Sequence, residues 1–308
     1  MRRSSSAIRS LVARWTGRAA AAAVALLAAR HDAVAQGRLS EKATVSQTVG
    51  NTTITVEYYR PVARGRTNIF PNVVHWNQRW TPGANWATTI EVDHDVKVEG
   101  QPLPKGKYSL WATVRPDTWT FDFHRSARRF HLSRPDSTDR QLRVSARADS
   151  GALTEVLTFD FPEIATGATT LRLRWGTMVV PLHLTMIAPP LAMVAPAERG
   201  RFTGRYDVEV SSLEPGRPNR HLVIDIVDTG DALRWRDVEN PGQPLRDFIF
   251  SPSPGSDDEL TRAQRSADGQ WWTQSGIVIA FTIASGRATA FEARIEDGTV
   301  VSRGTRAR

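Results

Sequence analysis

Residues 118–124 read TWTFDFH, and this stretch shows the pattern that decides the fold of the first half of the chain. Trp119, Phe121 and Phe123 occupy every second position, and polar residues stand between them. Successive side chains of a strand point to opposite faces of a sheet, so a period of two predicts one face in a core and one in water. The segment therefore favours a half-buried antiparallel strand.

The same period of two continues from residue 43 to residue 186, and turn-forming residues divide it into segments. Gly50-Asn51 and Glu99-Gly100-Gln101 separate strand-like runs and are typical of hairpin turns. We count eight or nine strands and find no convincing amphipathic helix. The pattern predicts an all-β fold, with residues 36–186 forming an antiparallel β-sandwich or jelly-roll-like domain.

Residues 187–200 separate this region from the rest of the chain. They contain Pro189, Pro190 and Pro196, which oppose regular helix and ladder pairing, so we expect a Pro-rich linker.

The β-pattern resumes in residues 201–308 and predicts a small antiparallel β-barrel-like domain. Ser285-Gly286-Arg287 is a good hairpin turn between two apolar runs. Residues 251–269 are rich in Ser, Pro and Asp, so we expect a long polar loop there, with a short helix over residues 258–264.

The first 35 residues have the three parts of a secretory signal peptide. A positive segment from Arg2 to Arg18 precedes an apolar run of 11 residues, and Ala33-Val34-Ala35 supplies a small-x-small cleavage pattern before Gln36. Eleven apolar residues are too few to span a bilayer as a helix. We expect cleavage and export, which would leave a soluble periplasmic or extracellular protein with no membrane span; an uncleaved anchor is the alternative.

Charge and composition narrow the function classes. The net charge of +8 falls to +3 when the signal peptide, with its six Arg and one Asp, is set aside. The remaining charges are mixed in sign, so we expect no nucleic-acid partner. The chain has no Cys, and it contains no nucleophile elbow, zinc-protease motif, phosphate loop or dinucleotide fingerprint. We therefore expect no cofactor and favour a protein that is not an enzyme.

Four segments of the first region carry a resemblance to a known family. They are Val45 to Gly50, Tyr59 to Phe70, Trp80 to Thr89 and Leu103 to Leu110. Together they resemble the bacterial family named domain of unknown function 2911, from about residue 39 to residue 186. The resemblance implies a secreted β-rich domain and no particular chemistry. Family members usually carry Arg directly after the Trp, where this chain has Thr81.

The second region resembles, at the level of pattern, the lipocalin-like β-domain appended to β-lactamase-related hydrolases. The similarity is carried by Phe202 to Tyr206, the strand meander that follows, and Gly286 to Thr289 before an apolar strand. Such appendages accompany a catalytic domain, and no motif of one is present in this chain.

Residues 75–86 read HWNQRWTPGANW and hold the most promising binding residues. Trp rings stack on sugars or cations, and Asn, Gln and Arg side chains orient polar groups. With the neighbouring polar loop, we expect these candidates to line one ligand-binding face: Arg60, Arg66, Trp76, Trp80, Asn85 and Trp86. The alternative is that the Trp rings cap the sandwich core and that Asn85 serves a turn.

Two further groups are candidates for chemistry. Asp93 and Asp95 flank a His and are weak candidates for metal ligands; we expect no metal there and favour a charged hairpin turn. Asp122 and His124 lie two apart on the polar face of one strand and could act as an acid/base pair. The simpler interpretation is a solvated surface pair.

The leading hypothesis is an exported, non-catalytic β-protein that binds an envelope glycan or another small ligand through its Trp/Arg/Asn loop face. One alternative is a secreted hydrolase that uses the Asp/His site. The other is a structural component of the envelope.

Overall fold

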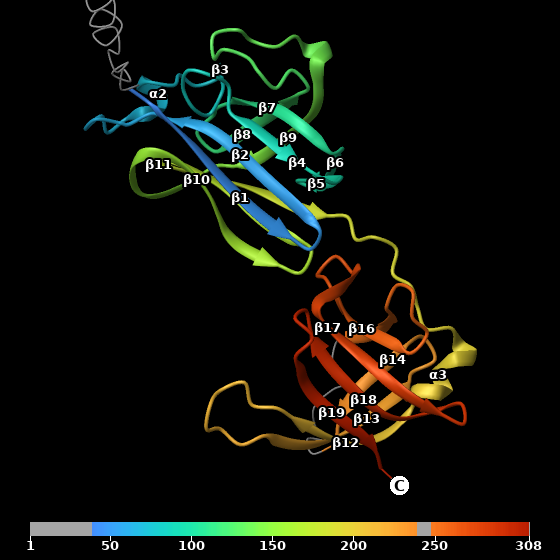
Figure 1. Ribbon diagram of the computed structural model, residues 1–308. Helices are drawn as coiled ribbons and strands as arrows, with labels where there is room; N and C mark the ends of the chain where they lie inside the picture. The colour runs from blue at the N-terminus through green and yellow to red at the C-terminus, as the bar shows by residue number, and fades with distance from the viewer. Residues whose placement is uncertain (1–38, 239–247, 308) are drawn as a thin grey trace, which may run out of the picture. The chain divides into compact units, whose positions relative to one another are not determined.

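The structure, a computed structural model, describes residues 39–238 and 248–307 (Figure 1). The expected signal peptide lies outside the described residues. Antiparallel strands dominate the described part, which confirms the expected all-β fold. None of the helices found there is both long and apolar enough to cross a membrane.

The first β-region, here named the sandwich, contains eleven strands and two short helices. Its elements are β1 (Glu41–Val49), β2 (Thr52–Arg60), α2 (Ile69–Asn72), β3 (Arg79–Trp80), β4 (Thr89–Val92), β5 (Val96–Val98), β6 (Gln101–Leu103), β7 (Gly106–Thr113), β8 (Thr118–His124), the 3-10 helix η1 (Ser137–Asp139), β9 (Arg140–Arg147), β10 (Asp149–Ala165) and β11 (Ala168–Met186). The expectation of eight or nine strands was too low, because β3, β5 and β6 have two or three residues each and are too short to show alternation.

Two sheets make up the sandwich. The seven-stranded sheet has the order β1-β2-β4-β7-β8-β9, with β3 paired to β7, and the four-stranded sheet has the order β10-β11-β5-β6. Both expected hairpins are present: Gly50 has φ +58 between β1 and β2, and Glu99 and Gly100 have φ +48 and +75 between β5 and β6. In the β5–β6 turn, two successive residues with positive φ give the tight turn that twisted strands prefer.

Apolar side chains from the inner faces of both sheets form one core. The seven-stranded sheet contributes residues such as Ile54, Leu110 and Phe121, and the four-stranded sheet contributes residues such as Phe159 and Leu173. The alternation of the sequence therefore separates a core face from an outer face. The outer face of the seven-stranded sheet carries the candidate sites.

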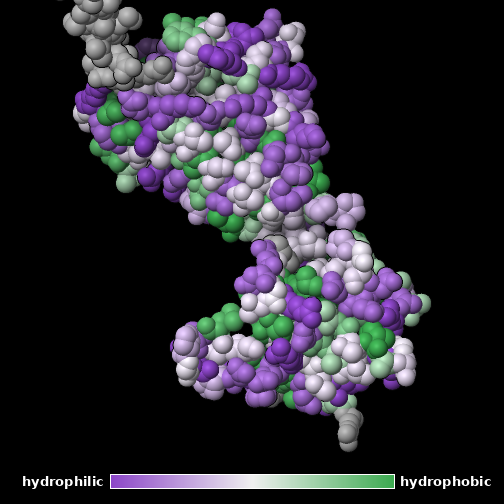
Figure 2. Space-filling model, in the orientation of Figure 1, coloured by the Kyte–Doolittle hydropathy of each residue, from purple (hydrophilic) through white to green (hydrophobic). Residues whose placement is uncertain are grey.

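The second β-region is a closed barrel of eight strands, as expected. Its elements are β12 (Gly204–Val210), β13 (Arg220–Asp228), β14 (Leu233–Asp237), β15 (Phe248–Pro252), β16 (Glu259–Arg265), β17 (Trp271–Ala284), β18 (Arg287–Ile295) and β19 (Val300–Arg306). Tyr206, Phe250, Phe281 and Phe291 are buried together in its core. On the face that Figure 2 shows, hydrophilic residues cover most of the surface of each β-region.

Two expectations about local structure were wrong. The helix expected over residues 258–264 is strand β16, because ladder pairing with β15 and β17 outweighs the local preference of a polar sequence. The segment expected to be a linker without helix ends in α3 (Pro196–Phe202). Pro196 stands at the start of this helix, where its missing N–H has no helical partner to lose.

Candidate functional site

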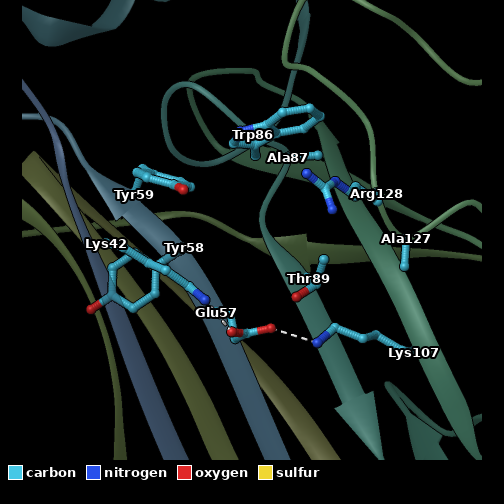
Figure 3. A pocket seen from close by; sticks show the side chains of 10 residues that line it. All are labelled: Lys42, Glu57, Tyr58, Tyr59, Trp86, Ala87, Thr89, Lys107, Ala127 and Arg128. Atoms are coloured by element: carbon cyan, nitrogen blue, oxygen red, sulfur yellow. Dashed lines mark hydrogen bonds and ion pairs between the residues drawn. The ribbon is translucent and has the colours of Figure 1, made fainter. Parts of the chain in front are cut away.

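A pocket of about 390 Å³ opens on the outer face of the seven-stranded sheet (Figure 3). Strands β1, β2, β4 and β7 form its floor, and the loops before β4 and after β8 form its rim. We name it the Trp86 pocket, and its lining residues are Lys42, Glu57, Tyr58, Tyr59, Trp86, Ala87, Thr89, Lys107, Ala127 and Arg128.

Strand register brings the floor residues together. Glu57 of β2 stands opposite Thr89 of β4, and Glu91 of the same strand stands opposite Lys107 of β7. Directly opposed residues on one face lie about 5 Å apart. Residues distant in sequence therefore share a small patch of the outer face.

Glu57 holds two lysines at the floor. Its carboxylate oxygens lie 2.5 Å from the Nζ atoms of Lys42 and Lys107, and Lys107 also lies 3.3 Å from Glu91. Hydrogen bonds from Lys107 and Lys42 lower the pKa of Glu57, and the hydrogen bond to Glu57 raises the pKa of Lys107. Both shifts favour the charged forms of Glu57 and Lys107, so the floor presents donors and acceptors side by side.

Trp86 forms the aromatic part of the rim and is 37% exposed. Its ring meets Phe130 edge-on at 5.9 Å, and the Arg128 guanidinium lies 4.9 Å from its centroid. Two backbone hydrogen bonds flank Trp86, from Ala87 N to Arg129 O at 2.8 Å and from the residue 131 amide to Asn85 O at 2.9 Å. The ring is therefore fixed before any ligand arrives, which lowers the entropic cost of binding.

Thr89 adds a polar group without a partner. Its side chain is 9% exposed, and its hydroxyl forms no hydrogen bond within the described residues. Buried hydroxyls are nearly always hydrogen-bonded in folded proteins, so this enclosed hydroxyl is an unsatisfied polar group in the pocket wall.

The six residues expected to line one face are distributed over several places. Trp86 lines the Trp86 pocket, Arg66 lines a second hollow beside α2, and Trp76 lines a third with Phe70. Trp80 is partly buried and packs against the sandwich core, where its ring stacks on Trp175 with centroids 6.0 Å apart.

The other polar candidates bind backbone and neighbouring side chains. Arg60 donates from Nε to Leu157 O at 3.2 Å and from Nη2 to the Thr158 hydroxyl at 3.0 Å, which ties β2 to β10. Arg66 donates to two carbonyl groups of its own loop. Asn85 has φ +59 and holds the Trp86 loop through its carbonyl.

Asp93 and Asp95 lie near a bend between β4 and β5, and the side chain of each accepts a hydrogen bond from a backbone amide. Asp93 accepts a hydrogen bond from the Thr53 amide at 2.8 Å, and Asp95 accepts one from the Lys105 amide at 2.7 Å. Across residues 39–238 and 248–307, no cluster of three His, Cys, Asp or Glu is arranged to hold a metal ion.

Asp122 is buried, contrary to the simpler expectation of a solvated surface pair. It is 2% exposed, and it accepts hydrogen bonds from Arg143 at 2.6 and 2.8 Å and from Arg79 at 2.6 Å. Burial acts to raise the pKa of Asp122, but the hydrogen bonds from Arg143 and Arg79 outweigh it, so the pKa lies below its ordinary value. Asp122 therefore remains a carboxylate bound to arginines.

His124 is also buried, at 0% exposed, so the surface expectation is wrong for it too. Its Nδ1 lies 4.0 Å from Asp139, and neither ring nitrogen has a hydrogen-bond partner within the described residues. Burial lowers the pKa of His124, which favours the neutral ring. The loop over residues 125–139 leaves β8 at His124 and returns at Arg140, directly opposite it.

Most residues of the Trp86 pocket were missed by sequence reasoning. Those missed include Lys42, Glu57, Tyr59, Thr89 and Lys107. Alternation does place Glu57 and Thr89 on outward positions of their strands. It does not give the strand order β1-β2-β4-β7, which is what makes these positions neighbours.

Comparisons with known proteins give a family-model match within the sandwich and no activity. No curated protein matches the chain. The chain is similar to the crystal structure of a protein of unknown function from the DUF3598 family of Nostoc punctiforme PCC 73102, with 8% identity over 74% of this chain and 95% of that chain. The TM-score of 0.17 is too low to indicate a shared fold. The model of the family described as protein of unknown function (DUF2911) matches residues 40–184, which form nearly all of the sandwich, and this match confirms the resemblance indicated by the sequence motifs.

Proposed function

We propose that this protein is exported and binds an acidic saccharide in the Trp86 pocket without catalysing a reaction on it. The observation that carries the proposal is the combination of a fixed, partly exposed Trp ring with charged hydrogen-bonding groups in one open pocket. Small-molecule sites are typically apolar surfaces with a few well-placed polar groups.

The aromatic rim suits the apolar face of a sugar ring. Trp86 offers a large, rigid surface, and Tyr59 lies across the pocket from it (Figure 3). Aromatic side chains contribute much contact area at a low entropic cost. A pyranose ring has an apolar face of C–H groups that fits such a surface.

The floor suits the hydroxyl groups of the sugar. Adjacent hydroxyls on a sugar ring each donate and accept, and the floor offers an acceptor in Glu57 next to donors in Lys42 and Lys107. Hydrogen bonds to charged groups contribute about 1.5–3 kcal/mol each.

The charge of the lining favours a ligand with a carboxylate. Three cations, Lys42, Lys107 and Arg128, line the pocket with one anion, Glu57. The Arg128 guanidinium is exposed and held over the Trp86 ring, where its planar donors match a carboxylate. A hexuronic acid unit combines such a carboxylate with a hydroxylated ring.

Calorimetric titration with a hexuronic acid oligosaccharide and a neutral hexose oligosaccharide of equal length tests this proposal. We expect the acidic ligand to bind about tenfold more tightly, since one charge-assisted hydrogen bond contributes about 1.4 kcal/mol or more. Trp86→Ala should weaken binding at least tenfold. The proposal fails if neither saccharide binds, or if Trp86→Ala binds as well as the native protein.

A matched pair of acidic residues provides the control. Glu57→Gln removes the acceptor that holds both lysines at the floor, and it should weaken binding several-fold. Glu91→Gln alters a residue that also pairs with Lys107 but does not line the pocket, so binding should change less than twofold. Equal losses in the two variants would point to general charge effects in place of a built site.

Export and domain organisation belong to the same proposal. The signal-peptide pattern supports cleavage before Gln36, and sequencing the N-terminus of protein secreted by a bacterial host checks it. A mature chain starting at or near Gln36 is expected, and retention of Met1 in exported protein would contradict cleavage. We take residues 36–186 and 201–308 as two domains joined by a linker over residues 187–200.

A further inference from the structure

A second polar site lies on the other half of the same outer face, on strands β3, β8 and β9. Arg143 binds Asp122 through Nε and Nη2, Arg79 binds it through Nη2, and the Arg140 Nε lies 3.9 Å from it. We name this group, Arg79, Arg140 and Arg143 around Asp122, the arginine cluster. None of its residues lines the Trp86 pocket.

The cluster contains more positive charge than the buried carboxylate requires. One bidentate arginine already neutralises a carboxylate and matches its geometry. Three arginines on one aspartate leave an excess of two positive charges. Asp139 lies at the edge of the cluster, where it accepts a hydrogen bond from the Ser126 amide, and counting it still leaves an excess of one.

Several guanidinium donors of the cluster are unused and reachable. Arg79 engages Asp122 through Nη2 alone, and Arg143 leaves its Nη1 without a partner among the described residues. The side chains of Arg79, Arg140 and Arg143 are 23%, 30% and 49% exposed. Asp122 therefore holds the arginines in place while their remaining donors face outward.

A row of hydroxyl groups borders the cluster. In the strand register, Arg79 stands opposite Thr113, Thr113 stands opposite Thr120, and Thr120 stands opposite Ser145. All three hydroxyl residues are at least partly exposed. Guanidinium and hydroxyl donors from neighbouring strands suit an anion with oxygens in several directions.

We propose that the arginine cluster binds a phosphate group, free or carried on a lipid headgroup. Inorganic phosphate has four oxygens and one to two negative charges at neutral pH, and the phosphodiester of a lipid headgroup has two non-bridging oxygens and one negative charge. Either group matches the excess charge of the cluster and can accept from several of its donors. Asp122 acts as the positioning residue, because it fixes the guanidinium groups before the anion arrives. This site is separate from the Trp86 pocket and does not depend on a saccharide.

Calorimetric titration of the mature protein with inorganic phosphate, in a phosphate-free buffer, tests the proposal. Arg143→Gln should weaken binding at least fivefold. Arg147→Gln is the matched control, because Arg147 lies on the same strand and is exposed but does not contact Asp122, and its effect should stay below twofold. Both variants keep the core face of β9 intact.

Sedimentation with vesicles of phosphatidylglycerol or phosphatidylcholine separates the two sources of phosphate. Binding of inorganic phosphate that depends on Arg143 supports a site for the free ion. Vesicle binding that depends on Arg143, without binding of inorganic phosphate, supports a headgroup site. The proposal is overturned if no phosphate probe binds, or if Arg143→Gln and Arg147→Gln lose binding equally.

Discussion

Trp80 and Trp86 are six residues apart in the chain, yet they lie on opposite faces of the seven-stranded sheet. Trp80 is partly buried, and it stacks on Trp175 and meets Trp119 edge-on at the sandwich core. Trp86 is more exposed and lies at the rim of a pocket. The pairing of β3 with β7 decides the direction of Trp80, since Arg79 then points outward and Trp80 inward. The residue type alone does not distinguish a core role from a binding role.

The largest expected effect is a difference in the free energy of unfolding between substitutions on the core face and on the outer face of the sheet. Trp175→Ala should lower the free energy of unfolding by about 3–5 kcal/mol, because it removes a large buried ring and leaves a cavity. Trp86→Ala should cost about 1 kcal/mol or less, since its ring is partly in water already. Chemical denaturation of both variants measures the difference. Similar losses would mean that Trp86 belongs to the core.

The next effect concerns the buried carboxylate on the outer face. Asp122→Asn should lower the free energy of unfolding by about 2 kcal/mol, because Arg79 and Arg143 lose the negatively charged acceptor of their hydrogen bonds. Asp93→Asn provides the comparison, since Asp93 is exposed and its partners are the Thr53 amide and the exposed His94 ring, and it should lower the free energy of unfolding by about 0.5 kcal/mol. Equal stability of Asp122→Asn and the native protein would contradict the burial of this face.

A smaller effect should depend on pH. Burial is the largest influence on the pKa of His124 and lowers it. The carboxylates of Asp122 and Asp139 act to raise this pKa, and the guanidinium groups of Arg79 and Arg140 act to lower it further. The net shift is downward, which favours a neutral ring in the folded state. The unfolded chain takes up this proton near pH 6.5, and the folded chain takes it up at lower pH. Stability from His124 is therefore complete above about pH 6.5 and falls as the pH drops toward the folded pKa.

Denaturation at pH 8 and pH 5 measures this dependence. His124→Gln should reduce the loss of stability between the two values, because Gln does not titrate. His183→Gln, which replaces an exposed histidine of β11 that pairs with Glu99, is the control substitution. An unaltered pH dependence in His124→Gln would show that His124 is charged or solvated in the folded protein.

The alternation of the sequence was enough to predict the fold class and the two main hairpins. It misplaced β16, because the pairing that makes residues 259–265 a strand comes from distant segments. It also assigned Asp122 and His124 to the correct face but left them in water. Alternation tells which face a residue occupies and does not tell that both side chains are buried there.

The candidate site could be predicted only in part. Trp86 was found because an aromatic residue among turn-forming residues is an unusual local signal. Glu57 and Lys107 were not found, since they lie on strands separated by β4 and become neighbours only through the order of the sheet. Strand order is a property of the folded chain and leaves no local mark on the sequence.

Oxidation of each tryptophan by N-bromosuccinimide, followed by mass spectrometry with and without the hexuronic acid oligosaccharide, tests most directly whether the two faces have different roles. We expect rapid oxidation of Trp86, slow oxidation of Trp80, Trp119 and Trp175, and protection of Trp86 by the saccharide. Oxidation of Trp80 as fast as that of Trp86, or no protection of Trp86 by a bound saccharide, would contradict the account.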